Sequence, residues 1–254
     1  MNEYPEQPRV ALVTGANKGI GRAVATLLAA AGYRVVVGAR DPRRGAETAA
    51  AIQAAGGDAH AVELDVTDRA AVQSAASWID EHLGRLDVLV NNAGISGSGQ
   101  AAPQDALDRV PSSVDVELVR EVFDTNVFAV IGVTNAMLPL LRRSPAARIV
   151  NVSSHSASLA LTAEVGGPIS TLLSAAYSPS KTALNALTLQ YANELRADGI
   201  LVNAVAPGYV DTDINGHSGL LTPEQGAAVV VRLATVGEGG PTGGFFSEDG
   251  PLPW

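Results

Sequence analysis

Short valine-rich runs alternate with longer helical stretches along most of this chain. The runs predict strands at Arg9–Val13, Arg34–Gly38, Ala59–Leu64, Val88–Asn91, Arg148–Val152 and Leu201–Val205, with a further strand in the tail at Gly243–Phe246. Helical composition extends over Arg22–Ala31, Arg43–Ala55, Arg69–Leu83, Val114–Leu141 and Ser178–Ala197. Strands that alternate with long helices form βαβ units, and right-handed crossovers place helices on both faces of the sheet. The sequence therefore predicts an α/β fold with a doubly wound parallel β-sheet, in a single domain spanning residues 1–254.

Two segments interrupt this alternation. Residues 155–176 are loop-like and contain two glycines and a proline, and residues 209–223 are polar and contain glycine. Loops at the carboxyl ends of parallel strands are where such sheets bind ligands. We therefore expect the insertion 155–176 to form one wall of a substrate pocket, with His155, Ile95 and Tyr209 as neighbours, and residues 209–223 to form a substrate loop.

Charge and composition exclude several classes of partner. The formal net charge is −9, which argues against nucleic-acid and anionic-membrane partners because these reward a basic face. The chain has no cysteine, and its four histidines lack ligand-like spacing, so we expect no disulfide and no metal site. Residues 1–9 do not resemble a signal peptide, and no run of about 18 uncharged apolar residues suggests a membrane span. A cytoplasmic protein with a small-molecule partner is expected.

A glycine-rich turn follows the first predicted strand and opens the first helix. Its glycines, Gly15, Gly19 and Gly21, would allow a tight turn, approach of the backbone to a pyrophosphate and close helix–strand packing. The helix N-terminus would then face the phosphates with unpaired N–H groups. In this context the turn predicts a Rossmann-type dinucleotide site that includes Gly15, Asn17, Lys18, Gly19 and Ile20. The alternative is a structural turn that binds nothing.

The end of the second predicted strand bears on the choice of cofactor. Enzymes that use NAD usually carry an acidic residue there to accept the ribose hydroxyl, whereas this chain has Arg40. Arg40 and the nearby Lys18 are two cations that could pair with a 2′-phosphate, which favours NADP(H). Asp41 is a competing feature, because it could turn toward the ribose. Arg40 could also be a solvated surface residue.

A tyrosine and a lysine four positions apart predict an acid–base pair. Tyr177 and Lys181 would share one face of a helix, and an ammonium near a phenol lowers the pKa of the phenol toward the working pH. Such a tyrosine can donate a proton to a carbonyl oxygen or remove one from an alcohol. Taken alone, this pattern also fits a surface tyrosine with an unrelated lysine.

The motifs occur together and in order. These are the turn Thr14–Gly21, Asp65-Val66, Asn91-Asn92-Ala93-Gly94, Asn126, Val152-Ser153-Ser154, Tyr177 with Lys181, and Pro207-Gly208. Over nearly its whole length the chain thereby resembles the short-chain dehydrogenase/reductase family. The resemblance implies an oxidoreductase that uses a nicotinamide dinucleotide.

The resemblance also implies roles for individual residues. Ser154 would hydrogen-bond the substrate carbonyl, Tyr177 would be the acid and base, and Lys181 would lower the tyrosine pKa and hold the nicotinamide ribose. Asn126 would anchor a water that leads protons to the lysine, and Ser153 competes with Ser154 for the serine role. Further cofactor contacts would come from Asp65, Val66, Asn92, Ala93, Gly94, Pro207, Gly208, Val210 and Thr212.

The stretch between Ser154 and Tyr177 is about ten residues longer than in compact members of the family. An insertion at this place, the Asn17-Lys18 pair, Ala39-Arg40-Asp41 and the tail resemble NADPH-dependent carbonyl reductases, which are often monomeric. The insertion of this chain is shorter than theirs. We therefore expect NADPH-dependent reduction of a ketone or aldehyde to an alcohol, by hydride transfer with proton donation from tyrosine. A homo-oligomer stays open as an alternative. Two other functions also stay open, a 3-oxoacyl or polyketide-type ketoreductase and a non-catalytic NADP(H) sensor.

Overall fold

In the computed structural model, residues 8–97 and 110–254 are described; most of the N-terminal segment considered above lies outside them. Eight strands of this part of the chain form one sheet in the order β3-β2-β1-β4-β5-β6-β7-β8. All neighbouring strands are parallel except the last pair. The strands are β1 (Val10–Thr14), β2 (Arg34–Ala39), β3 (Asp58–Glu63), β4 (Val88–Asn91), β5 (Arg148–Val152), β6 (Leu201–Val205), β7 (Phe245–Ser247) and β8 (Gly250–Pro251).

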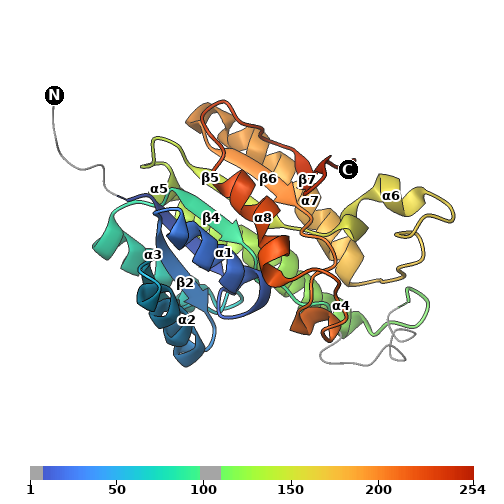
Figure 1. Ribbon diagram of the computed structural model, residues 1–254. Coiled ribbons are helices and arrows are strands. Elements are labelled where there is room, and N and C mark those ends of the chain that lie inside the picture. The colour runs from blue at the N-terminus through green and yellow to red at the C-terminus, as the bar shows by residue number, and fades with distance from the viewer. Residues whose placement is uncertain (1–7, 98–109) are drawn as a thin grey trace.

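Helices cover both faces of the sheet, as Figure 1 shows. The helices are α1 (Gly19–Ala30), α2 (Pro42–Ala54), α3 (Arg69–Leu83), α4 (Val116–Phe123), α5 (Ala129–Leu141), α6 (Leu159–Ala163), α7 (Tyr177–Glu194) and α8 (Pro223–Ala234). Alternate residues of β1 point to opposite faces: Ala11 and Val13 pack in the core under α1, α2 and α8, and Val10 and Leu12 in the core under α3, α5 and α7. The predicted doubly wound sheet is therefore confirmed.

The predicted helix Val114–Leu141 is interrupted in the structure. α4 is followed by a π-helical turn at Asp124–Phe128, which continues into α5. Pro139 lies inside α5, two residues before its end, so the helix does stop close to the proline. A π-turn inserts an extra residue into an α-helix, and it is frequent at functional sites. Here it carries Asn126.

Two elements were missed in the sequence. α8 begins with Thr222 as N-cap, Pro223 in the first turn and a capping box that Gln225 completes, and this signal could have revealed the helix. The insertion 155–176, predicted as a loop, contains a 3₁₀ turn at His155–Ala157 and the short helix α6. The last turn of α7 also ends three residues earlier than predicted, at Glu194.

The continuous helical stretch Val116–Leu141 is long and apolar enough to cross a membrane by length and composition alone. However, 56% of its most apolar 18-residue window is buried inside the protein. Val133, Met137 and Leu141 belong to the core beneath α3 and α7. The stretch thus behaves as a core helix of the domain.

Candidate active site

The motif residues gather at one edge of the sheet because they follow the carboxyl ends of parallel strands. Gly15 follows β1, Asn92 follows β4, Ser153 follows β5 and Pro207 follows β6 shortly after its end. Strands β1, β4, β5 and β6 are consecutive neighbours in the sheet. Segments far apart in the sequence therefore meet at this edge.

Tyr177 and Lys181 lie on the first turn of α7, beside the end of β5. The Lys181 Nζ is 5.9 Å from the centre of the Tyr177 ring and donates a hydrogen bond of 2.8 Å to the Val152 carbonyl oxygen. Lys181 is only 4% exposed, whereas Tyr177 is partly exposed. The Ser154 hydroxyl is near enough to the Tyr177 hydroxyl to affect its pKa. The structure thus brings together the serine, tyrosine and lysine singled out in the sequence.

The expected lowering of the Tyr177 pKa by the ammonium is not found in this structure. Burial raises the pKa of Tyr177 above its ordinary value, and the nearby Ser154 hydroxyl offsets part of that rise. Burial also lowers the pKa of Lys181 to about 8, because the ammonium has lost its water. The physical reason is desolvation of both groups. A raised pKa keeps Tyr177 protonated at neutral pH, which is the form that donates a proton to a carbonyl.

The Ser153 side chain is buried and hydrogen-bonded within the protein, which favours Ser154 as the serine that binds the substrate. Ser153 is 3% exposed, and its hydroxyl donates a hydrogen bond of 2.7 Å to Asn185 on α7. Its backbone N–H donates to the Val205 carbonyl oxygen of β6. Ser154 is more exposed, and besides Tyr177 its hydroxyl also lies 3.1 Å from that of Ser156.

Asn126 ties the loop after β4 to the start of α7. Its Oδ1 accepts a hydrogen bond of 2.9 Å from the Ile95 N–H, and its Nδ2 donates to the Ile95 carbonyl oxygen and to the Ser180 hydroxyl. Ser180 in turn donates to the Tyr177 carbonyl oxygen. Because its oxygen and both amide hydrogens are engaged by protein groups, the Asn126 side chain positions this site. Its role in anchoring a water stays a prediction.

Gly94, in the loop after β4, lies against this cluster. A Cβ at Gly94 would lie 3.1 Å from Asn126 Oδ1 and 3.3 Å from Lys181 Nζ. We expect Gly94→Ala to displace the lysine and to lower kcat/KM by about tenfold, because small displacements of positioning groups cost catalysis of that order or more. Steady-state kinetics measure this.

Gly132→Ala is the matched control, because Gly132 lies exposed within α5 and a Cβ there would meet nothing within 4 Å. That change should keep full activity and stabilise the helix by about 0.5–1 kcal/mol. Equal activity in the two variants would show that Lys181 tolerates displacement.

The glycine-rich turn has the geometry expected for a dinucleotide. Gly15 and Gly19 have φ of +63° and +52°, and a Cβ at Gly15 would lie 3.1 Å from the Ala93 Cα. The N-cap of α1, Lys18, makes no side-chain capping bond, so no side chain covers the helix N-terminus from that position. An anion fits such an end. The Asn92 side chain donates to the Thr14 and Gly15 carbonyl oxygens, so it shapes this turn.

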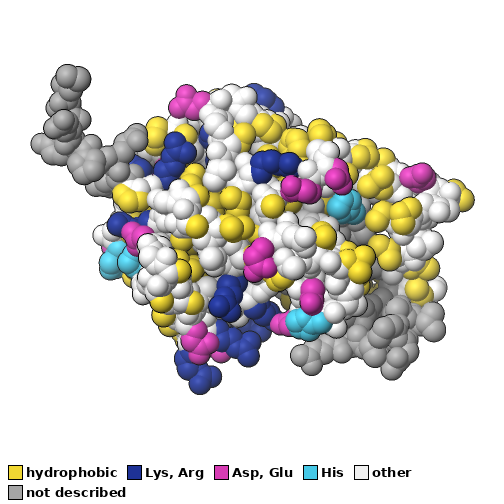
Figure 2. All heavy atoms as spheres, viewed as in Figure 1, with side chains coloured by type: hydrophobic (Ala, Val, Ile, Leu, Met, Phe, Trp, Pro, Cys, Tyr) yellow, Lys and Arg dark blue, Asp and Glu magenta, His cyan; other side chains and the backbone are white. Residues whose placement is uncertain are grey.

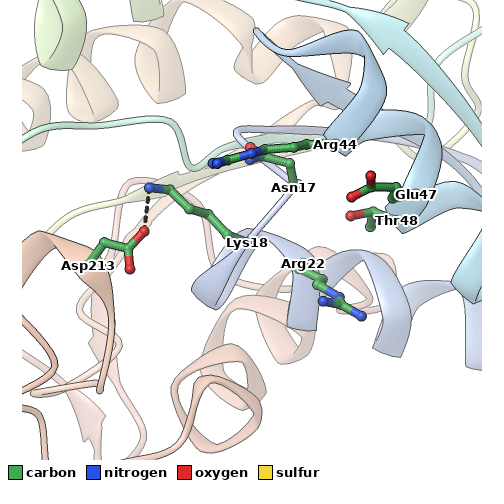
Figure 3. A pocket seen from close by; sticks show the side chains of 7 residues that line it. All are labelled: Asn17, Lys18, Arg22, Arg44, Glu47, Thr48 and Asp213. Carbon is green, nitrogen blue, oxygen red and sulfur yellow. Dashed lines mark hydrogen bonds and ion pairs between the residues drawn. The ribbon is translucent and has the colours of Figure 1, made fainter.

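A pocket of about 430 Å³ opens beside the turn (Figure 3). It is lined by Asn17, Lys18, Arg22, Arg44, Glu47, Thr48 and Asp213. Figure 2 shows basic side chains gathered on one side of this hollow, with acidic and histidine side chains facing them. Arg22 and Arg44 were missed in the sequence. Each lies in the first or second turn of a helix that follows a predicted cation, Lys18 or Arg40, and this closeness in sequence was the available signal.

Arg40 is exposed and does not line this pocket. The pKa of the Asp65 carboxyl is lowered mainly by its hydrogen bond with the Thr67 hydroxyl, and the positive charge of Arg40 adds to this effect. The Asp41 carboxylate caps α2 by accepting from the Arg43 and Arg44 N–H groups, and these bonds lower the pKa of Asp41. The competing role of Asp41 at the ribose stays a prediction.

The substrate loop packs against the glycine-rich turn. The Thr212 Cγ2 lies 3.2 Å from the position of a Gly19 Cβ, and Gly208 adopts φ of +89° above Leu221. Val210 is 4% exposed and packs on Gly226 of α8, so its side chain serves the core. Ile20 and Val66, also predicted as cofactor contacts, are partly buried hydrophobic residues against the two cores.

The insertion is fastened to the C-terminal tail. The Ala160 N–H donates to the Trp254 carbonyl oxygen, and the Trp254 ring stacks on Phe245 at 5.5 Å. Trp254 is therefore a packing anchor. His155 is the first residue of the 3₁₀ turn in the insertion. Burial lowers its pKa, which favours the neutral imidazole and suits a residue in the wall of the site. Within the part of the chain that the structure describes, no group of His, Cys, Asp or Glu could hold a metal ion.

Comparisons with known proteins agree with this geometry. The family model of the short chain dehydrogenases matches residues 9–220. "Short-chain dehydrogenase/reductase 1" of Saponaria officinalis is 37% identical over 299 residues, covering 100% of this chain and 98% of that protein. A putative ketoacyl reductase of the monensin polyketide synthase from Streptomyces virginiae is 42% identical, covering 80% and 71%. The solved structure of salutaridine reductase from Papaver somniferum superposes with a TM-score of 0.77 at 32% identity, covering 94% and 99%.

Proposed function

The chain belongs to the short-chain dehydrogenase family and is an oxidoreductase, and from this premise we propose that it reduces a ketone or aldehyde with NADPH, using Tyr177 as the proton donor. The observation that carries the proposal is the contact of Ser154 with a protonated, partly exposed Tyr177, with the buried Lys181 behind it. These groups meet at the carboxyl edge of the sheet, beside the turn suited to phosphate. Relatives at 33% and 34% identity are named as an isopiperitenone reductase and a neomenthol dehydrogenase, which supports a carbonyl or alcohol substrate.

The residues of this edge fit a nicotinamide dinucleotide. The glycine cradle that a Cβ at Gly15 would fill and the helix end at Lys18 suit the pyrophosphate. Further contacts would come from Asn17, Asp65, Ala93, Gly94, Lys181, Pro207, Gly208 and Thr212. When bound, the dinucleotide supplies the hydride.

The protein's own groups then handle the charge that develops on the substrate oxygen. Ser154 and Tyr177 donate hydrogen bonds to that oxygen, and these bonds strengthen as negative charge grows there. Tyr177 passes its proton to the oxygen and becomes a phenolate, and the Lys181 ammonium stabilises that phenolate. The tyrosine thus need not be acidic at rest, because its proton leaves only as the substrate oxygen becomes basic.

Preference for NADP(H) is proposed from the cations around the pocket of Figure 3. Lys18, Arg22 and Arg44 line it, whereas Arg40, which follows β2, is not among its lining residues, and its role at the 2′-phosphate stays a prediction. We expect Arg44→Ala to raise the KM for NADPH by about tenfold and to leave the KM for NADH nearly unchanged, since a hydrogen bond to a charged group contributes about 1.5 kcal/mol. Initial rates with each cofactor measure this.

Arg43→Ala is the control for that change, because the Arg43 side chain is 88% exposed and is not among the residues that line the pocket. It should leave both KM values unchanged. An equal rise of the two KM values in Arg44→Ala would contradict the assignment of Arg44 to the 2′-phosphate.

A ketoreductase acting on carrier-bound acyl chains is the second candidate, and the Streptomyces virginiae relative supports it. Such an enzyme needs a basic docking patch, and the arginines to consider for it are Arg142, Arg143 and Arg148. In the structure Arg142 pairs with Asp198, Arg143 pairs with Asp80, and Arg148 is 5% exposed. These arginines are therefore poor docking groups, and the free ketone is preferred.

One screen separates the candidates. NADPH consumption should be followed over aldehydes, cyclic ketones, quinones and acyl thioesters, and repeated with NADH. We expect turnover of free ketones or aldehydes with NADPH. Turnover of acyl thioesters alone would support the ketoreductase, and binding of NADPH without any turnover would support a non-catalytic sensor. A cytoplasmic location and the oligomeric state stay predictions, the latter open to light scattering.

A further inference from the structure

Lys18 and Asp213 form an ion pair between two loops that are far apart in the sequence. Lys18 closes the glycine-rich turn, and Asp213 begins the 3₁₀ turn Asp213–Asn215 of the substrate loop. Lys18 Nζ and Asp213 Oδ2 are 2.5 Å apart, with side chains 58% and 42% exposed. Figure 3 shows the lysine directed at the aspartate, while Arg22, Glu47 and Thr48 lie on the opposite side of the pocket. Exposed ion pairs of this kind contribute little to fold stability.

The Asp213 carboxylate is held in this direction from its other side. The His217 Nε2 lies 2.8 Å from Asp213 Oδ1, and the His217 Nδ1 lies 2.7 Å from Asp211 Oδ1. His217 has φ of +62°, a left-handed conformation that few non-glycine residues adopt. The bonds to Lys18 and His217 keep the pKa of Asp213 low, so its carboxylate is anionic at neutral pH.

This anion shares a pocket with three cations. Asp213 lines the same walls as Lys18, Arg22 and Arg44. The Asp213 carboxylate is paired with the Lys18 ammonium, and its negative charge repels any dianion placed in the pocket. We propose that Asp213 competes with the 2′-phosphate of the dinucleotide for Lys18, so that this carboxylate sets how strongly the protein prefers NADP(H) to NAD(H). The inference rests on the proposed function, because it requires a 2′-phosphate in this pocket.

Two small probes isolate this end of the dinucleotide. Adenosine 2′,5′-bisphosphate carries the 2′-phosphate, 5′-AMP lacks it, and neither has a nicotinamide to contact the rest of the substrate loop. By calorimetry we expect Asp213→Asn to bind the bisphosphate about two- to fivefold more tightly than the wild type, the range spanned by exposed ion pairs. The affinity for 5′-AMP should not change. Asparagine keeps the shape of the side chain and removes its charge.

Two further variants make the result specific. In a Lys18→Met background the gain from Asp213→Asn should largely disappear, because the ammonium for which the two anions compete is gone. Asp211→Asn should leave both affinities unchanged, since Asp211 contacts His217 and not Lys18. Circular dichroism of each variant reports that the fold is kept.

The other outcomes each have a definite meaning. Weaker binding of both probes by Asp213→Asn would show that the ion pair holds the nucleotide in place. A full gain in affinity for the bisphosphate in the Lys18→Met background would show direct repulsion between Asp213 and the phosphate. Either result overturns the competition for Lys18. A wild type that prefers the bisphosphate, with no effect of Asp213→Asn, overturns the competition alone. A wild type without that preference overturns the NADP(H) assignment and the competition together.

Discussion

Replacing Tyr177 with phenylalanine should lower kcat for ketone reduction by about 10²–10⁴-fold, the usual contribution of a positioned general acid. The phenol is the group that meets the developing oxyanion, and the ring itself packs at the start of α7. Phenylalanine keeps that ring and removes only the hydroxyl, so the loss should fall on kcat. Affinity for NADPH, measured by fluorescence titration, should stay within about twofold, because the phosphate-binding turn and the other proposed cofactor contacts do not use that hydroxyl.

Tyr191→Phe is the matched control for this loss. Tyr191 lies near the C-terminal end of α7, away from Ser154 and Lys181, and its hydroxyl donates a hydrogen bond of 2.9 Å to the Asn135 side chain on α5. That variant should lose about 1 kcal/mol of stability and keep its turnover. If Tyr177→Phe and Tyr191→Phe reduced kcat equally, the loss would reflect packing of α7 and not proton donation.

Replacing Lys181 with methionine should abolish most activity and at the same time stabilise the fold. The lysine is nearly buried with a pKa of about 8, below its ordinary value, so folding at neutral pH forces a charge into a dry site. Removing it should raise the free energy of unfolding at pH 7 by about 1–2 kcal/mol, after subtracting the lost hydrogen bond to Val152. We expect kcat to fall by about 10²-fold, because the Tyr177 phenolate loses its ammonium.

The sign of the pH dependence follows from the same pKa. In the wild type the reduction rate should be constant below pH 8 and fall as Lys181 loses its proton above it. The destabilisation caused by the buried ammonium is fully present below about pH 8 and is relieved as the pH rises toward the ordinary lysine pKa. In Lys181→Met both pH dependences should vanish. A variant that was less stable and kept its pH profile would show that Lys181 only fills space.

The fold could be predicted because its signals are local and repeated. The valine-rich runs that became β1, β2, β4, β5 and β6 are buried on both faces and read as apolar stretches without alternation. α8 escaped notice because its apolar positions follow a polar loop, although Thr222 and Gln225 mark its start. The π-turn at Asn126 could not be predicted, because the residue sequence of α4 and α5 is compatible with one unbroken helix.

The candidate site, too, could be predicted from the sequence only in part. Tyr177, Lys181 and Ser154 are set by spacing and by strand ends, so sequence motifs locate them. The raised pKa of Tyr177 depends on how much protein surrounds it, which no spacing records. Lys18 and Asp213 pair across two loops that are 195 residues apart in the sequence, and only coordinates bring such charges together.

The most direct test follows deuterium from the cofactor to the alcohol product in a single reaction. A ketone found in the screen is incubated with NADPH that carries deuterium at both positions of nicotinamide C4, and the alcohol product is examined by mass spectrometry. The account predicts one deuterium on the carbinol carbon with the wild type, and almost no labelled alcohol with Tyr177→Phe at full saturation with NADPH. Unlabelled alcohol from the wild type, or labelled alcohol formed at the wild-type rate by Tyr177→Phe, would contradict it.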